Sequence, residues 1–349
     1  MTSESGHGKG KLVLGIIAVA VVAVLAGFLG FGSSTDNSIY SAPASTDADW
    51  GKDGEPLNLL TPKTGNSIQA PAKNTVFACV TVGVPHTKLK IKLGPELGKS
   101  MTQAATPWVR DNRVIISDIV TLPGSVAVES KLEITEEGDM RRFKSNGMPN
   151  HPIGTFPIPK DSPSYKYYAA LPAAGYDNAA EIPVVPYDLD VLLPLNPEIA
   201  KKPSCIPNLM TGFALTGAAW HIEIAGDSKL NIFDPNAALP TDQCFGHPYE
   251  GQYHYHGYSW KCMEKGAPGK QSPLLGYAAD GFGIYGPLDE NGKVITNAQL
   301  DECHGRVAEV EFNGKRQEMY HYVLNNEYPY SIGCFRGTPL PGEMESMNH

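Results

Sequence analysis

The stretch CFGHPYEGQYHYHGYSWKC, residues 244–262, decides how we interpret the rest of the chain. It carries three of the ten histidines, His247, His254 and His256, interleaved with tyrosines and bounded at both ends by cysteine. If residues 252–257 are extended, the period of two places His254 and His256 on one face of a strand and the neighbouring tyrosines on the other. Two imidazoles about 6.5–7 Å apart along one face can converge on a single metal ion, with a third ligand from elsewhere. The spacing therefore predicts a metal site; the alternative is a half-buried aromatic strand with solvent-facing histidines.

Four further stretches accompany the tetrapeptide YHYH in this chain. They are SNGMPNHPIGTFP (145–157), SPLLGYAADGFGIYGP (272–287), LDECHGR (300–306) and YHYVLNNEYPYSIGCFRG (320–337). On these motifs the chain resembles the YHYH-domain family from about Arg141 to Gly337. The resemblance implies a domain and not a particular reaction. In one departure, a second Tyr-His-Tyr-His found in some relatives ends here in Val323, which cannot be a metal ligand.

Composition describes a globular, acidic protein. The chain has 349 residues, 42% of them hydrophobic, which suffices for a core in one large or two ordinary domains. The formal net charge is −9, and outside the N-terminus no cluster of Lys and Arg is longer than a pair. Nucleic acid is therefore not an expected partner, because its binding needs a basic surface.

The N-terminal segment predicts attachment to a membrane. Residues 12–31 are apolar or glycine and carry no charge. This segment is long enough to span a bilayer as a helix. The preceding lysines place residues 1–11 in the cytoplasm by the positive-inside rule, so the rest of the chain is expected to be extracytoplasmic, in the periplasm or outside the cell. Residues 32–74, rich in Ser, Thr, Asp, Pro and Gly, predict a flexible tether. A cleaved signal peptide ending near Ala42-Pro43-Ala44 is the competing interpretation.

All six cysteines follow the predicted membrane span, and an even number in an exported segment favours disulfides. Six cysteines allow 15 pairings, and the sequence does not choose between them. We favour a first pair that closes the histidine-bearing loop, then a second pair near the C-terminus, with the third left by elimination. These pairs are Cys244–Cys262, Cys303–Cys334 and Cys79–Cys205.

The exported part predicts a mainly β fold: a single sandwich- or barrel-like domain over residues 75–341, followed by a tail at 342–349. Short runs with β-branched residues recur between turn signals, and hairpins are expected about Asp280-Gly281 and Asn313-Gly314. The proline-dense sequence at residues 158–207 predicts long covering segments or edge strands. A helical turn is expected with Asn297 as its cap. We see no internal repeat at a fixed period, since the two Tyr-His-Tyr segments are isolated.

The expected metal ligands are His254 and His256 first, then His247 and His321. His151 and His304 are further candidates, whereas His221 is expected to be an ordinary core or surface histidine. Imidazole ligands suit several transition metals, and copper or zinc is the expected cofactor outside the cytoplasm.

Three other functions remain open from the sequence. A metal-dependent hydrolase of the cell envelope would use metal-bound water with Asp280 or Glu250 as general base. A cysteine nucleophile at Cys334 is disfavoured by the even cysteine count. A non-enzymatic module that binds a metal, a small molecule or an envelope partner is the third.

Overall fold

The structure is a computed structural model that describes the chain from residue 124 onward almost continuously and a few short segments before it. The described residues are 57–58, 74, 76–78, 90–91, 109–110, 113–114, 124–161, 165, 182–207, 209–226, 231–233, 235–264 and 266–340. They all belong to one compact unit, Ser38–His349. The predicted membrane span at 12–31, most of the tether, Cys79 and the tail at 342–349 lie outside the described residues. Within the described part, no helix is long and apolar enough to cross a membrane.

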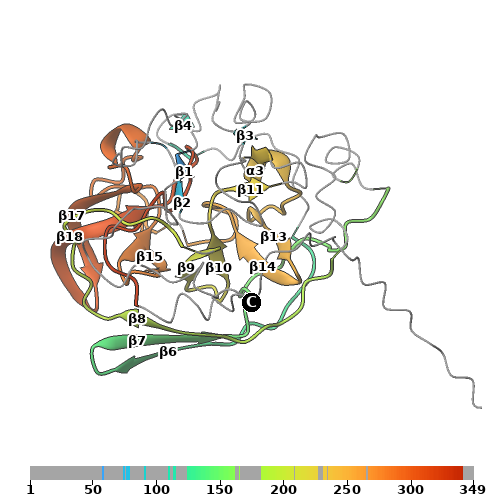
Figure 1. Cartoon of the computed structure of the whole chain (residues 1–349), viewed down its shortest axis with the longest axis horizontal. Helices are drawn as coiled ribbons and strands as arrows, with labels where there is room; N and C mark the ends of the chain where they lie inside the picture. Colours follow the sequence, from blue (N-terminus) through green and yellow to red (C-terminus); the bar gives the residue numbers. More distant parts are fainter. Residues whose placement is uncertain are drawn as a thin grey trace, which may run out of the picture. The chain divides into compact units, whose positions relative to one another are not determined.

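In the part of the chain that the structure describes, eight strands form one mixed sheet in the order β13-β14-β10-β9-β15-β16-β18-β17 (Figure 1). Its central strands β9 and β15 are buried along almost their whole length, as expected for strands covered on both faces. The strands are β9 (Met210–Ala214), β10 (Ala219–His221), β13 (Gly246–Tyr249), β14 (Gln252–Tyr255), β15 (Leu274–Ala278), β16 (Gly283–Tyr285), β17 (Gly305–Phe312) and β18 (Lys315–Val323).

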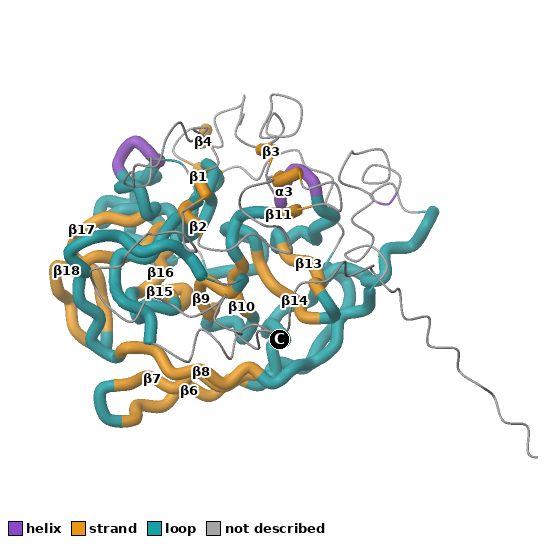
Figure 2. Tube along the Cα trace, viewed as in Figure 1, coloured by secondary structure: helices purple, strands orange, loops and turns teal. Residues whose placement is uncertain are grey.

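A three-stranded antiparallel sheet packs against the centre of the main sheet. It consists of β6 (Leu132–Glu137), β7 (Met140–Ser145) and β8 (Leu189–Pro194), and Figure 2 shows these strands next to one another. The ring of Phe143 lies 5.5 Å from that of Phe213 in β9, and the Arg141 guanidinium lies 3.7 Å from the centre of the Tyr277 ring in β15. One part of the core therefore lies between the small sheet and the middle of the large one.

The remaining described elements are short. They are β1 (Leu57–Asn58), β2 (Phe77–Ala78), β3 (Lys90–Ile91), β4 (Val109–Arg110), β5 (Arg113–Val114), β11 (Ala225–Gly226), β12 (Asn231–Phe233), the helix α3 (Pro235–Ala238) and the 3₁₀ helix η4 (Asn297–Gln299).

The mainly β prediction is confirmed, with sheets and almost no helix in the described residues. The β15–β16 hairpin turns about Asp280-Gly281, and the β17–β18 hairpin turns about Asn313-Gly314, as expected. The proline-dense region contributes β8, which is one of the two edge strands of its sheet. The sandwich- or barrel-like arrangement and the domain limits stay predictions.

One prediction about local structure is wrong. The cap of η4 is Thr296, whose backbone N–H donates to Gln299 Oε1 at 3.0 Å. Asn297 is instead buried, and its amide donates to the Tyr328 carbonyl oxygen at 2.7 Å. The expectation that the sequence shows no internal repeat at a fixed period stays a prediction, although the order of strands in the main sheet is symmetric about its centre.

The structure contains the two disulfides that were favoured. Cys244 is bonded to Cys262, and Cys303 to Cys334. Cys205 is also disulfide-bonded, and Cys79, its expected partner, lies outside the described residues. The Cys244–Cys262 bond closes the loop that carries the histidine strand, which restricts the unfolded chain.

Candidate metal centre

The two faces of β14 separate the histidines from the tyrosines, as the alternation predicts. On one face His254 lies beside His256, which follows the end of the strand. On the other face the Tyr253 hydroxyl donates to Asp242 Oδ2 at 2.9 Å, and the Tyr255 hydroxyl lies 2.8 Å from Thr216 Oγ1. Both tyrosines are fully buried, so these contacts hold the strand in one orientation.

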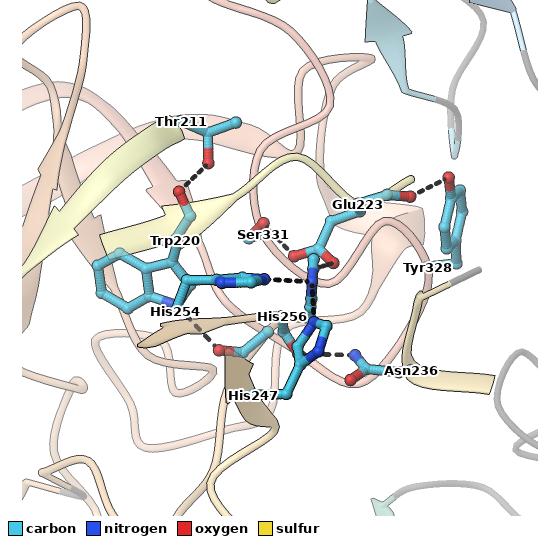
Figure 3. Close-up of polar contacts among 10 residues, drawn as sticks. Thr211, Trp220, Glu223, Asn236, His247, His254, His256, Tyr328 and Ser331 are labelled. Carbon is cyan, nitrogen blue, oxygen red and sulfur yellow. Dashed lines mark hydrogen bonds and ion pairs between the residues drawn. The ribbon is translucent and has the colours of Figure 1, made fainter. Parts of the chain in front are cut away.

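Three imidazoles converge on the histidine face (Figure 3). His256 Nε2 lies 3.1 Å from His254 Nε2 and 3.2 Å from His247 Nε2. His247 arrives from β13, where it is directly opposite His254 in the antiparallel pair. Two nitrogens bound to one zinc ion at about 2.0–2.1 Å and at a tetrahedral angle would be about 3.3 Å apart. The observed separations therefore match the edges of such a coordination shell.

The protons on two of these rings are assigned by their outer contacts. His254 Nδ1 lies 3.1 Å from the Gln252 carbonyl oxygen, which can only accept, so Nδ1 carries the proton. His256 Nδ1 lies 3.0 Å from Glu223 Oε2, and it donates to that oxygen when Glu223 is ionised. Both Nε2 atoms then present lone pairs to each other, an arrangement that a cation between them would stabilise.

Glu223 joins the site from the segment that follows β10, because β10 pairs in parallel with β14. Its carboxyl is fully buried and also accepts the Ser331 hydroxyl at 2.5 Å. A carboxylate behind a ligating imidazole is the usual outer contact in histidine metal sites, since it fixes the tautomer and raises the basicity of the ring.

His221, the last residue of β10, lies beside the histidine face of β14. It stacks on His254, with ring centres 3.6 Å apart and planes 12° apart. It is buried, and its Nε2 has no hydrogen-bond partner among the described residues. A stacked ring cannot aim its lone pair at an ion in the plane of His254, so His221 packs against the cluster and is not positioned as a ligand. The sequence interpretation of His221 as a core residue missed this contact.

Burial controls the charges of the site. It lowers the pKa of His247, His254 and His221 well below the usual value, and neighbouring imidazoles add to this effect. These rings are therefore neutral at pH 7, so that His247 and His254 can bind a metal without first losing a proton. Burial also raises the pKa of Glu223 well above its usual value, against the opposing effect of the Ser331 hydrogen bond.

The structure places His321 elsewhere. It lies on β18 in the other half of the main sheet, where its ring packs against Tyr285 with centres 5.2 Å apart. Its Nδ1–H donates to the Met319 carbonyl oxygen at 3.3 Å. His321 is therefore not part of the three-histidine group.

The two candidate general bases, Asp280 and Glu250, are not part of the three-histidine group. Asp280 is fully buried and accepts the Tyr322 hydroxyl at 2.6 Å and the Gly337 N–H at 2.8 Å through Oδ2. Glu250 is exposed at the β13–β14 turn, with φ at 49° and the next residue, Gly251, at 87°. Asp280 thus has a structural role at its turn, and Glu250 lies at an exposed turn position.

His151 and His304 lie outside the group as well. His151 Nε2 lies 2.6 Å from the Tyr255 hydroxyl on the opposite face of β14, and its Nδ1 lies 3.5 Å from the Cys244 sulfur. His304 Nε2 donates to Asn297 Oδ1 at 2.8 Å. His151, Cys244 and Cys262 form a second group of metal-compatible atoms, but both sulfurs are used in the disulfide.

The tetrapeptide of residues 253–256 therefore supplies two of the three converging imidazoles, and β13 supplies the third. Residues 190–293 match the family model described as YHYH protein. This YHYH segment contains the three imidazoles together with His221 and Glu223. The match is narrower than the sequence resemblance, because the stretches at 145–157, 300–306 and 320–337 remain outside it. No curated protein and no solved structure matches the chain.

Taken together, the YHYH segment brings three buried nitrogen donors within 4.8 Å of one another. This group could hold a metal ion. Spacing within β14 finds two of its members; a signal for Glu223 exists only in the alternation of His221 and Glu223 in AWHIEI, which does not reveal which strand they face.

Proposed function

We propose that this chain is a membrane-anchored, extracytoplasmic metal-binding module, in which His247, His254 and His256 bind one copper or zinc ion. The observation that carries the proposal is the convergence of the Nε2 atoms of His254 and His247 on His256 Nε2, at 3.1 and 3.2 Å, inside the core, with Glu223 behind His256. With Glu223 ionised, the Nε2 atoms of His254 and His256 present lone pairs to each other, and a bound cation removes the repulsion between them.

The expected location rests on the sequence, with support from the disulfides. The uncharged segment at 12–31 would anchor the chain, and an oxidising compartment suits Cys244–Cys262 and Cys303–Cys334. Imidazoles suit several transition metals, and copper or zinc is proposed here because of their availability outside the cytoplasm.

The site favours a binding module over the hydrolase. His247, His254 and His256 are each at most 3% exposed. A hydrolytic metal needs an open coordination position that a substrate can reach. Of the expected bases, Asp280 forms hydrogen bonds with Tyr322 and Gly337 and not with the three histidines, and Glu250 is exposed at a turn.

Metal analysis of the full-length chain tests the proposal. We expect about one equivalent of copper or zinc per chain, and the loss of most of it in His254→Ala/His256→Ala, because a single remaining imidazole binds weakly. Co²⁺ loaded in place of the native metal should give the visible absorption of a low-symmetry nitrogen site. The matched control is His321→Ala, which removes a buried histidine outside the group and should keep the metal. Retained metal in the double variant, or none in the unsubstituted chain, would refute the proposal.

A further inference from the structure

The main sheet consists of two halves with the same connectivity. In each half an antiparallel hairpin, β9–β10 or β15–β16, pairs in parallel through its second strand with the last strand of another hairpin, β13–β14 or β17–β18. The halves meet where β9 and β15 run antiparallel, with Phe213 opposite Tyr277. The order of strands is therefore the same from either edge, as a twofold axis at this pair requires.

The turns of the two first hairpins repeat in detail. Gly217 has φ at 109° and donates to the Ala214 carbonyl oxygen at 2.8 Å. Gly281 has φ at 89° and donates to the Ala278 carbonyl oxygen at the same distance, 2.8 Å. Both glycines adopt a backbone conformation that L side chains rarely enter, so the two turns need the same residue for the same reason.

The second hairpin of the first half begins with an aspartate clamp. Asp242 Oδ1 accepts the N–H groups of Cys244 at 2.8 Å and Gly246 at 3.1 Å, while the Tyr253 hydroxyl donates to Oδ2. A Cβ atom on Gly246 would lie 2.1 Å from the Tyr253 hydroxyl oxygen, so only glycine fits beneath that ring. Cys244 then forms the disulfide with Cys262.

The second half repeats this clamp residue by residue. Asp301 Oδ1 accepts the N–H groups of Cys303 at 2.9 Å and Gly305 at 3.1 Å, and also the Tyr320 hydroxyl at 3.0 Å. A Cβ atom on Gly305 would lie 2.2 Å from the Tyr320 hydroxyl oxygen. Cys303 forms the disulfide with Cys334. The segments DQCFGH and DECHGR are therefore structural equivalents.

This correspondence gives each residue of the three-histidine group a counterpart. Tyr255 pairs with Trp220, and Tyr322 with Ile284, in the two parallel ladders. His221, which follows Trp220, stacks on His254, and Tyr285, which follows Ile284, packs against His321. His254 therefore corresponds to His321. By the same alignment His247 corresponds to Arg306, His256 to Val323, and Glu223 to Pro287.

We call the three-histidine group the first corner, and the equivalent positions Arg306, His321 and Val323 the second corner. The second corner lacks two of the three imidazoles. Arg306 is directly opposite His321 and forms an ion pair with Glu290 at 2.5 Å. Val323 packs in a buried apolar cluster with Ile295 and Leu300. One imidazole of the three therefore persists, and the other two positions carry a guanidinium and an aliphatic side chain.

We propose that this domain is an internal duplication with two equivalent corners. The first corner became a metal site, and the second kept the same backbone frame. Two substitutions should therefore give the second corner a metal site as well. This inference rests on the proposed function of the first corner. It also separates the features that both halves share, which serve the fold, from His221, Glu223, His247 and His256, which occur in one half and serve the site.

The test is the full-length variant Arg306→His/Val323→His, in which His321 gains two imidazoles at the positions equivalent to His247 and His256. Metal content measured with Co²⁺ or Cu²⁺ should rise from about one to about two equivalents per chain. The control Arg306→Gln/Val323→His offers only two imidazoles and should bind its second ion at least tenfold more weakly. A folded double variant that still binds one equivalent would overturn the duplication proposal and leave the proposed function standing, whereas an unsubstituted chain without metal would overturn the proposed function itself.

A second variant covers the case in which the double substitution prevents folding. Val323→His alone retains the Arg306–Glu290 ion pair and places imidazoles at positions 321 and 323 on one face of β18. We expect this chain to bind a second, weaker Cu²⁺ ion with nitrogen ligands, seen as a second signal by electron paramagnetic resonance. Val307→His, on an exposed position of the same hairpin, should show no such signal. Equal spectra of the two single variants would refute the equivalence of the corners.

Discussion

Glu223 is the residue whose carboxyl group distinguishes the candidate metal centre from a chance cluster of histidines. It is fully buried, and it contacts His256 Nδ1 at 3.0 Å and the Ser331 hydroxyl at 2.5 Å. A buried carboxyl destabilises a fold unless a partner compensates for its lost hydration. The imidazole held between this carboxyl and a metal ion would provide that compensation.

Replacing Glu223 by glutamine should weaken metal binding without unfolding the chain. We expect Glu223→Gln to lower metal affinity by about 10–100-fold, the usual effect of losing the outer carboxylate. Competition with a chelator of known affinity measures the change. Glu309→Gln, which alters an exposed carboxylate on β17, serves as the control. If both variants bind metal as tightly as the native chain, Glu223 does not support the site.

At the scale of the element, β14 is held by its tyrosines so that its histidines can converge. Tyr253 and Tyr255 have no exposed surface, and their hydroxyls contact Asp242 and Thr216. Burial raises the pKa of Asp242 to about 6 although four donors oppose this shift. The orientation of the strand thus depends on polar contacts inside the core, which are sensitive to the loss of one partner.

Removing the Tyr253 hydroxyl should therefore destabilise the domain. Tyr253→Phe deprives the buried Asp242 of a donor, and we expect the free energy of unfolding to fall by about 1–3 kcal/mol. Urea denaturation of the metal-free chain at pH 7 measures it. Tyr249→Phe, at a half-buried position of the same hairpin, should change stability by less than about 0.5 kcal/mol. Similar losses in the two variants would show that the clamp does not orient β14.

At the scale of the whole molecule, buried neutral histidines link folding to pH. Burial lowers the pKa of His304 to about 4, below the value of 6.5 expected for the unfolded chain. Between pH 6.5 and 4 the unfolded chain therefore binds a proton that the folded chain does not bind. The resulting stability is present above pH 6.5 and is lost as the pH falls towards 4, by about 3 kcal/mol at about 1.4 kcal/mol per unit.

The variant His304→Asn isolates this contribution. Asparagine tolerates the positive φ of 70° at this position and does not titrate. We expect the variant to be less stable at pH 7, because its contacts differ, and to lose less stability between pH 6.5 and 4 than the native chain. Urea denaturation at several pH values compares the two slopes. Parallel curves would mean that His304 is protonated in the folded chain as readily as in the unfolded one.

The sequence determined the local structure around the site. The alternation in YHYH places His254 and His256 on one face because the side-chain period of a strand is two. The dipeptides Asp280-Gly281 and Asn313-Gly314 mark hairpin turns because their geometry requires positive φ. The even number of cysteines in a segment expected to be exported indicated disulfides, two of which the described residues contain.

Only the tertiary structure decided which distant side chains join β14. A period of two leaves the partner strand and its register open, so nothing in the sequence shows that β10 runs parallel to β14 and brings Glu223 to His256. For the same reason the sequence does not show that β18 lies in the other half of the sheet, where His321 is outside the three-histidine group. Local alternation depends on one strand alone, whereas the assembled site depends on long-range pairing, which is decided by the burial of both faces of the sheet at once.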